Sequence, residues 1–288
     1  MPNQPRMRRT AKTGAVPHRL AKNKRVLEPR DPAVLSRLAE EVTSRTFPRD
    51  QIDKWQREIH TLTMQLSRSI TRPNFDRVGR DDLVRMIRMY DERFFDGKIL
   101  PAAEAEKLSF GLSSRMTRIA GKLVTHYPQG NHEGSREFEL VLSSTLLFQT
   151  FEDTNRSVEV TGRQCRDRLE AMQRVAEHEL VHLVEMLIWN DGNCSESRFQ
   201  SIAKRYFAHT DYRHDLITQR ERALMKFNIR VGDLVQFPHD GHALTGRVNR
   251  ITRRATILVP SPKGEPFSDG GRYLKFYVPL EKLKRLPK

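Results

Sequence analysis

The stretch from Arg174 to Ile188, RVAEHELVHLVEMLI, decides how this chain folds and where its chemistry lies. It contains no Pro or Gly, and its apolar residues recur at intervals of three and four, a pattern that predicts a helix. Residues i and i+4 share one face of a helix, with Cβ atoms about 5–6 Å apart. His178 and His182 can therefore reach one cation, and Glu179 lies beside it.

The spacing His178-Glu179-x-x-His182 is the HExxH signature of zinc metallopeptidases. The two imidazoles supply metal ligands, and the carboxylate of Glu179 is placed to take a proton from a bound water. The alternative is a chance match, since short motifs carry that risk. We predict a Zn²⁺ site held by His178 and His182, with Glu179 as the catalytic residue.

From Leu83 to about Asp215 the chain resembles the SprT-like family of zinc metallopeptidases. Residues 82–100 resemble its opening helix, residues 108–116 and 119–123 its first hairpin, and residues 138–143 the strand before the metal helix, with a short helix at 144–148. The resemblance implies an α+β, zincin-like domain whose HExxH helix packs with other helices on a small antiparallel sheet. It also implies an endopeptidase whose protein substrates are DNA-bound or DNA-crosslinked.

One departure from the family concerns the third zinc ligand. Most members have a histidine four residues before an aromatic residue, and here Ser195 stands in that place before Phe199. A catalytic zinc normally takes three protein ligands. Cys194, one residue away, is our preferred third ligand because a thiolate binds zinc strongly, although a buried structural cysteine is the commoner case. The alternatives are His209, His214 or a carboxylate, Glu185 or Glu196.

Positive charge is concentrated at the two ends of the chain. Of the net charge of +15, residues 1–26 contribute eight Lys or Arg and no acid, and residues 230–288 contribute twelve basic and five acidic residues. Phosphate contacts by such residues give sequence-independent affinity, so both ends are predicted to bind DNA or another nucleic acid, unless they are only solubilising. The residues expected to do so are Arg8, Arg9, Lys22, Lys24, Arg25, Arg247, Arg250, Arg253 and Arg254.

Composition along the chain predicts four regions. Residues 1–30 are basic and poor in large apolar residues, which indicates a disordered arm. Residues 31–72 form a helical extension, with helices from Pro32 to about Ser44 and from about Pro48 to Leu66. Residues 73–220 form the SprT-like metallopeptidase domain. Residues 228–288 form a small all-β barrel that resembles SH3-like or KOW-type modules.

The barrel prediction rests on short β-branched segments with Gly and Pro turns, at residues 229–237, 246–251, 255–259 and 273–279. Tyr273 or Phe276, beside the basic residues of these segments, would suit base stacking. The alternative is an exposed sheet face with ordinary solvated charges.

The composition excludes several classes of protein. No segment approaches the ~20 apolar residues of a membrane span, and the N-terminus lacks an apolar signal core. Two cysteines imply no disulfide framework. The expected location is therefore the cytoplasm, where association with the nucleoid is also possible. Two functions remain open: a zinc endopeptidase recruited to DNA, and a non-catalytic nucleic-acid-binding protein with a structural zinc or a degenerate metal site.

Overall fold

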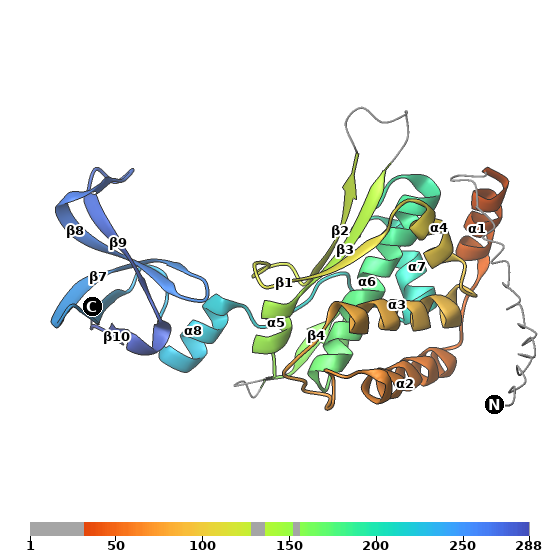
Figure 1. The fold of residues 1–288 in the computed structure, drawn as a ribbon, viewed down its shortest axis with the longest axis horizontal. Helices are drawn as coiled ribbons and strands as arrows, with labels where there is room; N and C mark the ends of the chain where they lie inside the picture. Colours follow the sequence, from red (N-terminus) through yellow and green to blue (C-terminus); the bar gives the residue numbers. More distant parts are fainter. Residues whose placement is uncertain (1–31, 128–135, 152–155, 288) are drawn as a thin grey trace, which may run out of the picture.

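A computed structural model describes residues 32–127, 136–151 and 156–287. Helices and strands are mixed within it and build two separate hydrophobic cores (Figure 1). The larger core lies in residues 32–217, which we call the main body, and the smaller one lies between α8 (Gln219–Phe227) and the C-terminal sheet. The predicted α+β class is confirmed. The predicted arm, residues 1–30, lies outside the described residues.

The helix that carries the motif is α6 (Arg168–Trp189), and buried residues lie on all of its sides. It begins at Asp167, whose carboxylate accepts a hydrogen bond of 2.9 Å from the backbone N–H of Glu170. It ends at Asn190, which adopts the left-handed conformation that Asn tolerates well. A helix that is buried on all sides belongs in an interior, and α6 also buries charged residues such as Arg174 and Glu177. The predicted helix is thus confirmed as the central element of the main body.

Other helices of the main body surround α6, and several of them contact it directly. The helices predicted from Pro32 and from Pro48 are confirmed, and their apolar residues join the same core as α6. In chain order the surrounding helices are α1 (Pro32–Ser44), α2 (Arg49–Leu66), α3 (Arg80–Phe94), α4 (Ile99–Ala105), α5 (Ser144–Gln149) and α7 (Ser197–Phe207).

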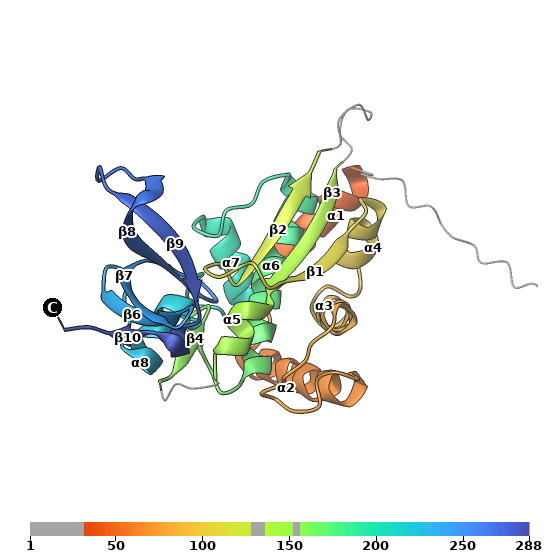
Figure 2. The ribbon, with the colours of Figure 1, turned by 60° about the vertical axis from the view of Figure 1, so that its left-hand side comes forward.

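The main sheet of the body has the order β1-β3-β2, with β1 (Ser109–Ser113), β2 (Gly121–His126) and β3 (Glu137–Ser143). The predicted hairpin of the first two segments is wrong, because β3 lies between them. β3 pairs antiparallel with β2 and parallel with β1. The strand Phe138-Glu139-Leu140-Val141-Leu142 is the most apolar of the three, and it takes the central, best-buried position. β2 is left as an edge strand that packs on α6 (Figure 2).

A second, two-stranded sheet joins β4 (Val158–Val160) and β5 (Arg163–Cys165), just before α6. An isolated bridge from Val160 to His214 ties the segment after α7 to this sheet. The chain then enters α8, which Arg156 fastens to the body through ion pairs with Asp215 (2.8 Å) and Glu221 (2.7 Å).

The C-terminal sheet has the order β10-β6-β7-β8-β9 and is antiparallel throughout. All four predicted strands are confirmed, but the predicted closed barrel is wrong. Among the described residues, the edge strands β9 and β10 do not pair with each other, so the sheet stays open. One reason is that β10 is only two residues long. The other is that β8 and β9 continue past a register shift between Pro260 and Glu265 and form a projecting arm. The strands are β6 (Leu234–His239), β7 (His242–Ile251), β8 (Ala255–Pro266), β9 (Arg272–Val278) and β10 (Lys284–Arg285), with a 3₁₀ turn at Leu280–Lys282.

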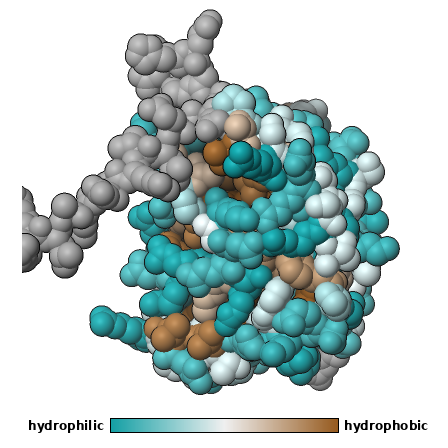
Figure 3. All heavy atoms as spheres, turned by 90° about the vertical axis from the view of Figure 1, so that its right-hand side faces the viewer, coloured by the Kyte–Doolittle hydropathy of each residue, from teal (hydrophilic) through white to brown (hydrophobic). Residues whose placement is uncertain are grey.

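The surface that lies to the right in Figure 1 is mostly hydrophilic, with hydrophobic residues only in small groups (Figure 3). Within the described residues, no helix is both long enough and apolar enough to span a bilayer.

Candidate metal centre

The two motif histidines project side by side from successive turns of α6, as their spacing predicts. Their ring centroids are 4.9 Å apart. Phe199 of α7 is buried behind them, with its ring centroid 4.8 Å from that of His178 and 4.5 Å from that of His182. This aromatic wall restricts both imidazoles to one side of the helix.

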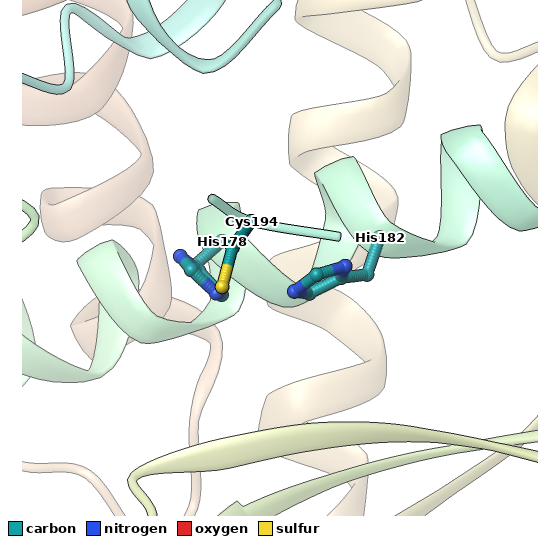
Figure 4. Close-up of side chains that lie close together, drawn as sticks. All are labelled: His178, His182 and Cys194. Carbon is teal, nitrogen blue, oxygen red and sulfur yellow. The ribbon is translucent and has the colours of Figure 1, made fainter. Parts of the chain in front are cut away.

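Cys194 is the third member of the cluster. The ligand atoms of His178, His182 and Cys194 all lie within 4.8 Å of one another, and each side chain is half-buried. Figure 4 shows the Sγ atom of Cys194 pointing towards the two imidazoles from a segment that crosses α6. The sequence predicted this cysteine as the preferred third ligand, and the structure brings it to the two histidines.

The segment that carries Cys194 is fastened to α6 by Arg198. The guanidinium of Arg198 donates a hydrogen bond of 2.7 Å to the buried carboxylate of Glu185 and one of 3.2 Å to the carbonyl oxygen of Asp191. It also lies over the ring of Trp189, 4.8 Å from the centroid. These contacts set the position of the turn before Cys194, and the sequence alone gave no sign of them.

The two histidines are in the neutral state that metal binding requires. Burial, with the nearby charge of His182, holds the pKa of His178 well below its usual value, and burial lowers the pKa of His182 to about 4. Both rings are therefore neutral near pH 7 and present lone pairs. Nδ1 of His178 is buried without a hydrogen-bond partner. Burial raises the pKa of the Cys194 thiol, and a coordinated metal ion would deprotonate it. The donor set fits zinc.

Glu179 lies on the side of α6 that faces β2, and only 3% of it is exposed. Burial raises its pKa to about 8, against the opposing effect of a backbone hydrogen bond from Leu123 of β2. Its Oε2 atom has no partner. A nearby divalent cation would lower this pKa again and favour the carboxylate.

Gly121, the first residue of β2, makes this arrangement possible. A Cβ atom at Gly121 would lie 2.5 Å from Oε1 of Glu179 and 2.8 Å from Val175, closer than van der Waals contact permits. The backbone of β2 can therefore approach Glu179 only because residue 121 has no side chain. Sequence reasoning assigned Gly121 no role, because nothing local marks a contact with a residue 58 positions away.

The alternative third ligands lie elsewhere. His209 is buried, and its Nε2 is 2.8 Å from the carboxylate of Glu177 on a different side of α6. His214 lines the same cavity as His178, but it lies outside the cluster of potential ligands found in the described residues. Glu185 is engaged by Arg198, and Glu196 is exposed at the start of α7. Of the five alternatives predicted for the third position, the structure brings Cys194 alone to the histidines.

A cavity of about 500 Å³ opens beside His178 and Glu179. Apolar side chains form much of its wall, and three arginines, Arg118, Arg156 and Arg213, also line it. The open side of the edge strand β2 begins at the same place, with Ala120 and Gly121 in the wall. A polypeptide could therefore lie along β2 with a side chain in the cavity and its backbone next to Glu179.

The predicted nucleic-acid-binding residues fall into two sets. Arg247, Arg250, Arg253 and Arg254 are exposed on β7 and on the turn between β7 and β8. The others, Arg8, Arg9, Lys22, Lys24 and Arg25, lie outside the described residues.

Comparisons with known proteins return no match: no family model, no curated protein and no solved structure is similar to this chain. What the site can do must therefore be inferred from its own residues.

Proposed function

We propose that this chain is a zinc-dependent endopeptidase of the SprT-like type, with a zincin-like main body, and that its basic ends recruit it to DNA-bound or DNA-crosslinked proteins. The observation that carries the proposal is the convergence of His178, His182 and Cys194 to within 4.8 Å, next to the buried carboxylate of Glu179. The sequence resemblance to the family supports the same function.

His178, His182 and Cys194 would hold the metal. Zinc bound there would supply Lewis-acid polarisation of the scissile carbonyl and a more acidic water. Glu179 then takes a proton from the attacking water on its carboxylate oxygen and returns it to the nitrogen of the leaving amine. The aromatic wall of Phe199 and the contact with Gly121 keep the imidazoles and the carboxylate in place.

The alternative is a non-catalytic nucleic-acid-binding protein whose zinc is structural. A closed structural site takes four protein ligands, but only three potential ligands gather in the part of the chain that the structure describes. His209 pairs with Glu177. His214 lines the cavity beside His178 but is not part of the group of three. A set of three leaves a position open for water, which favours the enzyme.

The test compares wild type with Glu179→Gln and Glu196→Gln, using the full chain. We expect about one zinc per chain in all three proteins, measured by elemental analysis. Wild type should cleave a DNA-binding protein in the presence of DNA, and Glu179→Gln should lose at least about 100-fold in rate, the low end for a general base. Glu196→Gln removes an exposed carboxylate nearby and should cleave like wild type.

Cleavage that persists in Glu179→Gln would reject the mechanism. A zinc-loaded wild type that cleaves nothing, with single-stranded or duplex DNA present, would favour the structural site. A chain that binds no zinc would reject both zinc sites and favour a nucleic-acid-binding protein with a degenerate metal site.

A further inference from the structure

The C-terminal sheet has one buried face and one exposed face. Val248, Ile257 and Phe276 lie opposite one another on β7, β8 and β9 and point into the small core. Side chains that are directly opposite on antiparallel strands share a face. The alternate residues therefore lie on the other side, which we call the outer face, in the rows Arg250–Thr256–Tyr277 and Arg247–Leu258–Lys275. Leu258 is the buried member of these rows, and the other residues are exposed or half-buried.

Tyr277 is the exposed aromatic residue of this face. It is 64% exposed, and within the described residues its ring makes no aromatic contact and its hydroxyl no hydrogen bond. The two aromatic residues suggested by the sequence are engaged elsewhere. The hydroxyl of Tyr273 is 2.9 Å from Asp269, and the ring of Phe276 packs against Phe237 in the core. In the structure, Tyr277 is therefore the aromatic residue available for base stacking, in place of Tyr273 and Phe276.

Three arginines in this part of the sheet are not neutralised by the protein. Arg250, Arg253 and Arg254 have no carboxylate within ion-pair distance anywhere in residues 32–127, 136–151 and 156–287. Arg247 donates a hydrogen bond of 3.2 Å to the carbonyl oxygen of Gly232, and its charge helps to lower the pKa of Asp269 without forming an ion pair among the described residues. Of the acidic residues before and after these arginines, Asp233 pairs with Arg285 and Glu265 with Lys275, and Asp240 lies 3.4 Å from the ring nitrogen of His239.

The spacing suits a chain of alternating bases and phosphates. Arg250 and Tyr277 lie in one row, two strands apart, which is about 10 Å. An arginine side chain can cover much of that gap. A flat aromatic ring flanked by free guanidinium groups is the combination that binds single strands, because unpaired bases stack on the ring while the cations contact the backbone. In a duplex the faces of the bases are covered by neighbouring bases, so no base could stack on the ring of Tyr277.

We propose that the outer face of the C-terminal sheet binds single-stranded DNA, with a base stacked on Tyr277 and phosphates bound by Arg247 and Arg250. Arg253 and Arg254, at the turn between β7 and β8, extend the track of positive charge. The inference deepens the DNA-binding part of the proposed function, and it needs neither the metal nor Glu179.

The test measures binding of the full chain to a labelled oligo-dT of about 20 nucleotides by fluorescence anisotropy. Tyr277→Ala should weaken binding about 5- to 100-fold, the range for loss of one stacked base, whereas Tyr277→Phe should stay close to wild type. The matched control is Leu274→Ala, which removes an exposed side chain of the same strand from the opposite face and should have no effect.

A second variant, with Arg247→Ala and Arg250→Ala together, should reduce the slope of log affinity against log salt by about 1.4, since each phosphate contact on a single strand contributes about 0.7. Lys263→Ala, on the projecting arm, should leave the slope unchanged.

The proposal is overturned if Tyr277→Ala binds like wild type, if Leu274→Ala loses as much, or if Tyr277→Ala weakens duplex binding equally. Tighter binding of the matching oligo-U would overturn the assignment to DNA. Because none of these assays depends on cleavage, a failure of the peptidase proposal in the Glu179→Gln experiment remains separate from a failure here.

Discussion

The main body and the C-terminal sheet hold their ionisable groups in opposite ways. In the body, Glu177 is completely buried and Glu179 is 3% exposed, and both have strongly displaced pKa values, about 2 and about 8. On the sheet, Arg250, Arg253 and Arg254 are exposed to solvent without carboxylate partners among the described residues. Burial changes the chemistry of a group, whereas exposure leaves only its charge. The comparison teaches that the body changes the acidity of its ionisable groups, whereas the sheet presents ordinary charges to solvent.

The sharpest test of this comparison removes one arginine from each region. Arg174 is 6% exposed, and its guanidinium lies 2.6 and 2.7 Å from the two carboxylate oxygens of Glu177. Arg174→Met leaves that buried carboxylate without its main partner and should cost about 3–5 kcal/mol in the free energy of unfolding. Arg250→Met, on the sheet, should change it by less than about 0.5 kcal/mol. Denaturant titrations measure both, and similar losses would break the comparison.

Zinc affinity tests whether the half-buried thiol of the body takes part in metal binding. Cys194→Ser should lower the affinity for Zn²⁺ by at least about 100-fold, more than the usual effect of changing a group that only supports a ligand. Cys165→Ser is the matched control, because that thiol points to the carbonyl oxygen of Arg163, at 3.6 Å, and lies outside the cluster of potential ligands. Competition with a chromophoric chelator measures the affinity, and an unchanged value in Cys194→Ser would remove this residue from the site.

The tight contact between β2 and α6 gives a third prediction. Gly121→Ala would place a Cβ atom 2.5 Å from Oε1 of Glu179 and should slow cleavage about 10- to 100-fold by displacing the carboxylate. Gly111→Ala on β1 meets only the flexible end of Glu139 at 3.3 Å and Val141 at 3.5 Å, so it should retain activity. Equal rates in the two variants would show that the close approach is not needed.

The smallest expected effect is a pH-dependent contribution of one partly exposed carboxyl group of the body, Asp53, to the free energy of unfolding. Burial raises the pKa of Asp53, but hydrogen bonds from Arg49 (3.0 Å) and Arg163 (2.7 Å) outweigh it and hold the pKa below 3.8. A carboxyl whose pKa is lowered by folding stabilises the protein above its unfolded pKa and loses that contribution as the pH falls. Asp53→Asn should therefore cost up to about 1 kcal/mol at pH 6.

The difference between Asp53→Asn and wild type should shrink as the pH falls below about 3.8. Thermal unfolding at several pH values measures it, and a gap that stays constant across this range would contradict the assignment.

Local patterns were enough to predict much of the fold. The unbroken stretch around His178 predicted α6, Pro32 and Pro48 marked the starts of α1 and α2, and β-branched segments marked four strands of the C-terminal sheet. These predictions succeeded because periodicity and the starts of helices depend on neighbours in the chain. The hairpin and the closed barrel failed because strand order and closure depend on which strands are best buried and how far they extend.

The sequence by itself determined the spacing of His178 and His182, the place of Glu179 beside them and the charge at both ends, since all three are properties of neighbouring residues. Only the tertiary structure decided the rest. In the folded chain, Cys194 and not His209 lies beside the two histidines as a potential metal ligand. Gly121 lies against Glu179, and Tyr277 rather than Phe276 is exposed on the outer face. Each of these depends on packing between segments far apart in the chain, which no local pattern specifies.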